Sequence, residues 1–109
     1  MKTKKKIYVA GPYTSPDPSE NTNKALRIGD TLMEMGYIPF IPHINHFWHM
    51  VTPRHYKSWL AYDIEWLKVC DALYRFPGKS SGSDKEEVIA RKLNIPVFYD
   101  INELERKLK

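Results

Sequence analysis

Cysteine is almost absent from this chain, and long apolar runs are missing altogether. Cys70 is the single cysteine among 109 residues, which excludes an intramolecular disulfide and is typical of a reducing compartment. No stretch is long and apolar enough to span a membrane, and residues 7–10 are too short a run for the core of a signal peptide. We therefore expect a cytoplasmic protein with no membrane partner.

The chain also lacks internal repeats, low-complexity linkers and a continuous basic face. Its 109 residues suffice for one domain, residues 1–109, with one core. The net charge of +4 comes largely from the two ends of the chain, where seven basic residues gather: Lys2, Lys4, Lys5, Lys6, Arg106, Lys107 and Lys109. A nucleic-acid-binding protein would need these cations on one face. We therefore expect no nucleic acid partner, although the excess charge favours anionic small molecules.

What the sequence does contain is an alternation of apolar strand-like runs and helical patterns. Strands are predicted at residues 6–10, 37–41, 71–76 and 97–99, and helices at about 20–35, 55–69 and 101–108, with a further helix that begins at the serine loop. Ser19 is the predicted cap of the first helix, Gly36 its end, and Pro39 places the second strand at an edge. Residues 42–56 are predicted to be a long irregular segment. This alternation predicts an α/β protein with a parallel sheet of four to five strands and helices on both faces.

Ligands of such sheets bind at the carboxyl ends of the strands. This rule gathers residues 11–15, the His43 region and residues 75–86 at one edge. The last of these ranges contains Ser81, Gly82 and Ser83 at a predicted helix start, where free N–H groups favour an anion. Ser81 and Ser83 are both candidate N-caps.

Two adjacent glutamates follow this serine loop. Glu87 lies four residues before Arg91 and is predicted to form an ordinary exposed ion pair. Glu86 is predicted to lie at the edge of the buried helix face, where Ala90 leaves room beside it and the helix dipole keeps its carboxylate ionised. Such a carboxylate suits a nucleophile, and the alternative is a plain acidic residue in the first turn.

Five motifs occur in a fixed order along the chain: residues 8–13 (YVAGPY), 59–67 (WLAYDIEWL), 70–73 (CDAL), 80–86 (SSGSDKE) and 95–97 (IPV). Together they resemble the nucleoside 2-deoxyribosyltransferase superfamily, in particular its short bacterial and phage members and the 2'-deoxynucleoside 5'-monophosphate N-hydrolases. The resemblance extends from residue 6 to about residue 99. It implies a small flavodoxin-like, Rossmann-like three-layer sandwich.

The resemblance also implies an activity and its catalytic residues. In that superfamily a glutamate attacks the anomeric carbon of 2-deoxyribose and displaces the base, and water or a second base then resolves the glycosyl-enzyme. The position of that glutamate matches Glu86, between Gly82 and Ala90, and the supporting aspartate matches Asp63, before Trp66 and Leu67. Two carboxylates about an anomeric carbon are the general device of glycosidases. We expect hydrolysis of 2'-deoxynucleosides or their 5'-monophosphates, with no metal and no other cofactor.

The remaining candidates are predicted to bind the substrate. They follow the predicted strands or begin the serine-rich helix, and they are Gly11, Pro12, Tyr13, His43, Ser81, Gly82 and Ser83. His43, His46 and His49 give a metal-like spacing, but no cysteine or carboxylate completes a site, and we do not predict zinc. One of these histidines, or Phe47, Trp48 or Trp59, is an alternative wall for the base.

Three alternatives stay open at this stage. The chain is expected either to hydrolyse the glycosidic bond or to exchange one base for another, and its opening loop at residues 11–19 does not decide which. A non-catalytic module that senses a nucleotide would use the same strand-end pocket without bringing Glu86 and Asp63 together.

Many aromatic residues in a short chain also lead us to expect a homodimer or a higher homo-oligomer.

Overall fold

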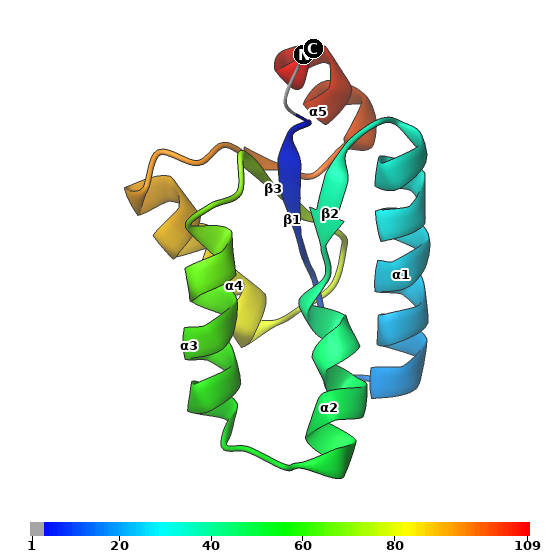
Figure 1. The fold of residues 1–109 in the computed structure, drawn as a ribbon, viewed down its shortest axis with the longest axis vertical. Coiled ribbons are helices and arrows are strands. Elements are labelled where there is room, and N and C mark those ends of the chain that lie inside the picture. Colours follow the sequence, from blue (N-terminus) through cyan, green and yellow to red (C-terminus); the bar gives the residue numbers. More distant parts are fainter. Residues whose placement is uncertain (1–3) are drawn as a thin grey trace.

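The computed structural model describes residues 4–109, which form a three-layer α/β sandwich (Figure 1). Lys2, one of the terminal cations, lies outside the described residues. The elements follow one another along the chain as β1 (Lys6–Ala10), α1 (Pro18–Glu34), β2 (Ile38–Phe40), the 3₁₀ helix η1 (Pro42–Ile44), α2 (Asn45–Val51), α3 (Tyr56–Leu67), β3 (Ala72–Arg75), α4 (Ser81–Lys92), β4 (Val97–Phe98) and α5 (Ile101–Leu108).

The sheet in this part of the chain has four parallel strands in the order β2-β1-β3-β4. Tyr8 of β1 pairs with Phe40 of β2 on one side and with Leu73 of β3 on the other. The strand that contains Pro39 therefore lies at an edge, as predicted, because proline cannot donate to a second neighbour. The predicted α/β class with a parallel sheet is confirmed.

Alternate residues of the central strand face two different cores. Ile7 and Val9 pack beneath α1 and α5, whereas Tyr8 and Ala10 pack with Leu67 of α3 and with α4. Figure 1 shows α1 on one side of the sheet and α3 and α4 on the other. Successive side chains of a strand point to opposite faces of the sheet. For this reason Tyr8, and not Ile7, faces the helix that carries Glu86.

The predicted start of the first helix is wrong, whereas its predicted end is confirmed. The first helix begins at Pro18, and its cap is Asp17, whose Oδ2 accepts a 3.0 Å hydrogen bond from the Glu20 amide, so Ser19 lies inside the helix. Proline at the first helical position and an acidic cap are a favourable start. The predicted end is confirmed, because Gly36 has a φ of +97° just beyond the last turn.

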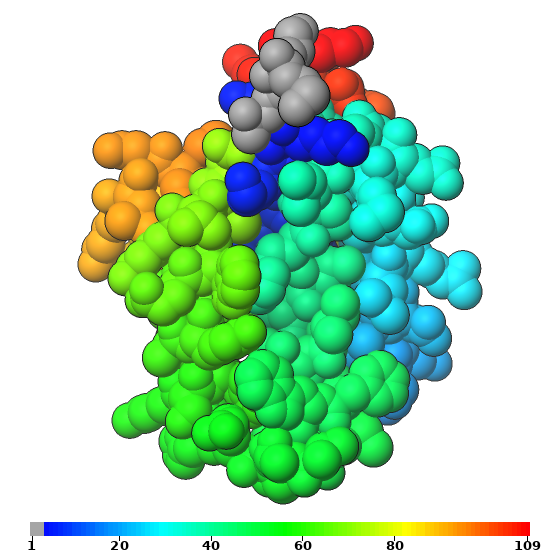
Figure 2. Space-filling view, viewed as in Figure 1, coloured from blue at the N-terminus to red at the C-terminus, as the bar shows by residue number. Residues whose placement is uncertain are grey.

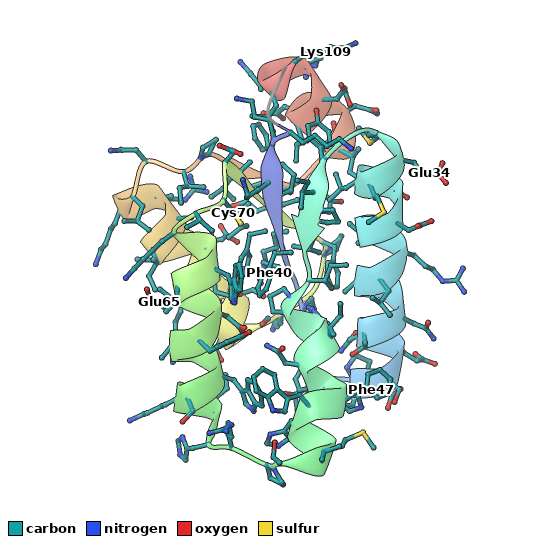
Figure 3. All side chains as sticks on the ribbon, viewed as in Figure 1. Glu34, Phe40, Phe47, Glu65, Cys70 and Lys109 are labelled. Carbon is teal, nitrogen blue, oxygen red and sulfur yellow. The ribbon has the colours of Figure 1, made fainter. Side chains whose placement is uncertain are left out.

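The predicted irregular segment at residues 42–56 is also wrong over most of its length. It contains η1 and the two-turn helix α2, although none of the residues of α2 is buried. Aromatic contacts hold α2 against α3, where Trp48 lies T-shaped on Trp59 with ring centroids 4.9 Å apart. Figure 3 shows aromatic rings in the space between these two helices. None of the helices in the described range 4–109 is long and apolar enough to cross a lipid bilayer.

Candidate active site

A cavity of about 490 Å³ opens at the carboxyl ends of the strands. Its walls come from the loop after β1, from η1 and α2, from α3, and from the first turns of α4. This is the edge at which the rule for parallel sheets places a ligand. The residues of the wall that bear on the chemistry are Gly11, Tyr13, His43, Asn45, Arg54, Trp59, Asp63, Lys79, Ser81, Gly82, Ser83 and Glu86.

Glu86 lies on the inner face of α4 and is only 7% exposed. The hydroxyl of Tyr8, from the central strand, donates a hydrogen bond to Glu86 Oε2. Burial raises the pKa of the Glu86 carboxyl to about 7, while the Tyr8 hydrogen bond and the charge of Arg75 act in the opposite direction. The prediction that Glu86 stays ionised at the helix start is therefore wrong as stated, because burial outweighs the stabilisation available there.

Asp63 lies on α3 and is 9% exposed. Its Oδ1 accepts a 2.9 Å hydrogen bond from Asn45 Nδ2 of α2. Burial and then the negative charge of Glu86 raise the pKa of Asp63 to about 8, and the hydrogen bond from Asn45 lowers it. The structure therefore brings the two carboxyl groups selected from the sequence into one cavity, close enough for their charges to interact.

The two carboxyl groups have different partners. Glu86 accepts a hydrogen bond from the Tyr8 hydroxyl and interacts with the positive charge of Arg75. Asp63 instead interacts with the negative charge of Glu86. The Tyr8 hydroxyl and Arg75 thus favour the ionised form of Glu86, and the charge of Glu86 favours the protonated form of Asp63. Environments that separate two carboxyl groups in this way assign one as a base or nucleophile and the other as an acid.

The raised pKa values predict how stability depends on pH. Free carboxyl groups titrate near pH 4, so between about pH 4 and pH 8 the folded protein holds more protons at Asp63 and Glu86 than the unfolded chain does. This pair therefore contributes stability at low pH that is lost as the pH rises through the folded pKa values.

We expect Asp63→Asn to remove much of this loss. The free energy of unfolding of the variant, relative to wild type, should rise by about 2 kcal/mol or more between pH 5 and pH 8.5. Urea unfolding of both proteins at the two pH values measures the difference. A difference that does not change with pH would contradict the buried, proton-retaining carboxyl.

The loop after β1 contributes Gly11 and Tyr13 to the wall. A Cβ atom on Gly11 would lie 2.2 Å from the Phe76 ring, so only glycine allows this close approach of loop and strand end. The Tyr13 hydroxyl shares a 2.6 Å hydrogen bond with His46 Nδ1 of α2, which ties the loop to the opposite wall.

His43 also lines the cavity, as its place after the second strand predicts, and Pro12 does not. The His43 ring is buried, and its Nε2 donates to the carbonyl oxygen of Pro12 at 2.7 Å. Burial lowers the pKa of His43, so this ring is neutral at pH 7. Pro12 packs against Gly78 and orients the histidine, and it is a structural neighbour of the cavity and not part of its wall.

The serine loop starts the helix at a different residue from the one predicted. Ser80 is the N-cap of α4, and its Oγ accepts a 3.1 Å hydrogen bond from the Ser83 amide. The prediction of Ser81 or Ser83 as the cap is therefore wrong, because both already lie in the first turn. Ser81, Gly82 and Ser83 all line the cavity.

Glu87 differs from its predicted surroundings. The guanidinium of Arg75, at the end of β3, binds Asp84 and lies 2.7 Å from Glu87 Oε2. Glu87 is also more than an ordinary exposed partner of Arg91, because it receives the Tyr99 hydroxyl as well and its side chain is largely buried. These contacts fix the first turns of α4 to the end of β3 and leave Glu86 on the cavity side.

The other two histidines of the run are engaged with their neighbours. His49 Nδ1 accepts a 2.8 Å hydrogen bond from the Trp59 indole, and His46 is held by Tyr13. Residues 4–109 hold no group of three His, Cys, Asp or Glu side chains that could bind one metal ion. Of the three aromatic residues predicted as a wall for a base, Trp59 lines the cavity, whereas Phe47 and Trp48 do not.

Sequence reasoning missed the two residues that contact the acids, Tyr8 and Asn45, and the two cations of the wall, Arg54 and Lys79. Tyr8 looked like one more apolar residue of a buried strand, although a buried tyrosine needs a partner for its hydroxyl, and this need was a usable signal. Nothing in the sequence marked Asn45, because its role depends on a helix that was not predicted.

The outer faces of α2 and α3 carry exposed apolar side chains, including Phe47 (63% exposed) and Val51 (79% exposed). Figure 2 shows this end of the molecule in green, at the bottom of the view. An interface between copies of the chain would use such a surface, and the oligomeric state stays a prediction.

Comparison with known proteins gives one family and one fold. A family model described as "Domain of unknown function (DUF7768)" matches residues 5–100. No curated protein sequence matches the chain. A solved structure of the 2-deoxyribosyltransferase from the psychrotolerant bacterium Bacillus psychrosaccharolyticus has a similar fold, with a TM-score of 0.61 and 22% sequence identity, over 84% of this chain and 69% of that chain.

Proposed function

The chain belongs to the family described as a domain of unknown function (DUF7768), and we propose that it cleaves the N-glycosidic bond of 2'-deoxynucleosides or their 5'-monophosphates. The observation that carries this proposal is the pair of buried carboxyl groups, Glu86 and Asp63, in the wall of one strand-end cavity. The fold shared with a 2-deoxyribosyltransferase supports the same class of chemistry.

Glu86 is proposed as the nucleophile. Its Oε2 is held by Tyr8, whereas Oε1 has no hydrogen-bond partner within the described range and remains available to attack the anomeric carbon. A bond forms between Oε1 and C1', the C1'–N bond breaks, and its electron pair passes to the base.

Asp63 is proposed as the acid and base. Its proton passes to the departing base as the C1'–N bond breaks, which leaves an aspartate. Water then attacks C1', gives its proton to that aspartate and frees Glu86, so the cycle returns both groups to their first state. Transfer to a second base would replace water in this last step, and hydrolysis is the outcome that we favour.

The cavity wall offers places for the other parts of a nucleotide. Trp59 and Tyr13 supply aromatic surface of the kind on which bases stack. Arg54 and Lys79 supply two cations, and the first N–H groups of α4 at Ser81 and Gly82 have no partner inside their own helix. Cations and a helix start in one wall favour an anionic substituent, and we therefore propose the 5'-monophosphate as the preferred substrate.

This preference predicts a selective effect of Lys79→Ala. The KM for a deoxynucleoside 5'-monophosphate should rise about ten-fold, because one charge-assisted contact is lost, while the KM for the matching deoxynucleoside stays nearly unchanged. Steady-state kinetics on both substrates measure this, with Lys92→Ala as a control at the exposed far end of α4, the helix that follows Lys79. An equal change for both substrates would contradict a phosphate contact at Lys79.

The proposal is tested by incubating the protein with a panel of deoxynucleosides and deoxynucleoside 5'-monophosphates, with and without an added free base. Chromatography separates released base from exchanged base. Base release without an acceptor would support the hydrolase, and turnover only with an added base would assign a transferase. Binding of these compounds without any turnover would contradict the enzyme and leave a nucleotide-binding module.

A further inference from the structure

Within the described range, the side chain of Asn45 is the one that forms a hydrogen bond with the carboxyl group of Asp63, and its nitrogen Nδ2 donates to Oδ1 at 2.9 Å. We propose that Asn45 is a positioning residue that keeps the proton of Asp63 on Oδ2, the oxygen it does not contact. This inference rests on the proposed function, in which Asp63 protonates the departing base. It assigns a role to α2, the helix that the sequence did not predict.

The position of Asn45 is fixed by the backbone around it. Asn45 is the first residue of α2, and its backbone N–H donates to the carbonyl oxygens of His43 and Pro42 in the preceding 3₁₀ turn. Its side chain spans from α2 to α3, and the contact of Trp48 with Trp59 holds the same two helices together. The side-chain amide of Asn45 is therefore held next to Asp63 by a turn that is fixed beside the cavity.

The chemistry of the contact determines where the proton lies. An amide –NH₂ group only donates, so an oxygen that accepts from it cannot also direct a proton along the same line. The carbonyl-type oxygen of a neutral carboxyl group is the stronger acceptor, so the Asn45 hydrogen bond favours the proton of Asp63 on Oδ2. Oδ2 has no hydrogen-bond partner between residues 4 and 109, and Asp63 lines the cavity, so this O–H is available to a bound molecule.

The contact also affects how tightly Asp63 holds its proton. Burial and the charge of Glu86 raise the pKa of Asp63, and the Asn45 hydrogen bond is the contribution that lowers it. Removing the amide should therefore raise that pKa further. The other titratable and charged groups around this cavity come from every element of its wall, and they are Tyr8 and Tyr13, His43, His46 and His49, Arg54 and Tyr56, Lys79 and Glu86.

The test compares Asn45→Ala and Asn45→Asp with wild type, and Asn23→Ala serves as a control on the exposed surface of α1. The probe is the side-chain carboxyl carbon of Asp63 in protein labelled with ¹³C-aspartate, followed by NMR from pH 4 to pH 10 without substrate. Asp63→Asn identifies the signal, because its spectrum lacks that resonance. Asn45→Asp is nearly isosteric and provides a folded variant if Asn45→Ala is unstable.

We expect the titration midpoint of Asp63 to rise by about one pH unit in Asn45→Ala, and by more in Asn45→Asp, where a second carboxyl group replaces the donor. Asn23→Ala should leave it unchanged. With substrate, kcat of Asn45→Ala at pH 7 should fall about ten-fold with little change in KM, because the proton is then shared between the two oxygens. The basic limb of the kcat profile should move to higher pH together with the NMR midpoint.

A midpoint that stays at its wild-type value in both Asn45 variants would overturn the inference, since a purely structural asparagine would lower thermal stability without moving the titration. This result is independent of turnover. Absence of base release by wild type would overturn the proposed function instead, and the NMR titration would still decide whether Asn45 controls the proton of Asp63.

Discussion

Glu86→Gln is expected to abolish base release, with kcat falling by about three orders of magnitude or more. The amide has the size and shape of the carboxylate but is a very poor nucleophile. It can still accept the Tyr8 hydroxyl through its carbonyl oxygen, so the fold around it should be retained. The substitution also replaces a buried ionisable group by a neutral one, and the variant should be at least as stable as wild type above pH 7.

Glu87→Gln is the matched control, because it makes the same chemical change at the next residue. Glu87 faces Arg75, Arg91 and Tyr99 and does not line the cavity. It should retain most of the activity and lose some thermal stability. Chromatography of released base measures activity for both variants, and circular dichroism measures folding. Base release by Glu86→Gln within ten-fold of wild type would remove Glu86 from the chemistry.

Asp63→Asn is expected to lower kcat by about two to three orders of magnitude, because a general acid at this position contributes rate in that range. An asparagine keeps the hydrogen-bonding shape but cannot give a proton to the base. The loss should be smaller for substrates whose base leaves easily without protonation, such as 7-methylguanine deoxynucleotides. Asp30→Asn, on the exposed surface of α1, is the control and should behave as wild type.

The pH profile provides a second measure of the same roles. Turnover needs Glu86 ionised and Asp63 protonated, and their pKa values of about 7 and about 8 predict a narrow bell with its optimum between them. The acid limb arises from protonation of Glu86, and the basic limb arises from loss of the Asp63 proton. Asp63→Asn should lose the basic limb and keep the acid limb. A variant that keeps both limbs would contradict this assignment.

The sequence predicts most of the sheet, and it does so through simple patterns. β1 is a short apolar run that ends at Gly11, and Pro39 places β2 at an edge, where the structure has it. The segment after β2 was missed, because a helix with no buried residue has no amphipathic pattern to detect. Its stability comes from aromatic contacts with α3, which are visible only once both helices are in place.

For the candidate site, the sequence locates the two carboxyl groups but not their partners. The family resemblance that the short motifs carry implies Glu86, and not Glu87, as the nucleophile and Asp63 as its partner, and both Glu86 and Asp63 lie in the cavity wall. The partners Tyr8 and Asn45 come from elements distant in sequence, 78 and 18 residues away from the acids they contact. The pKa of each acid depends on burial and on these contacts, so ionisation could not be predicted from a helix start alone.

The most direct test of the central claim, that Glu86 bonds to the anomeric carbon, is the configuration of the product formed in the presence of methanol. Methanol would replace water in the second step, and NMR distinguishes the two anomers of the methyl 2-deoxyriboside or its 5-phosphate. A covalent intermediate requires two displacements, so the account predicts the β anomer, with the configuration of the substrate retained. The α anomer would contradict the account, because it would mean direct attack by the solvent without a bond to Glu86.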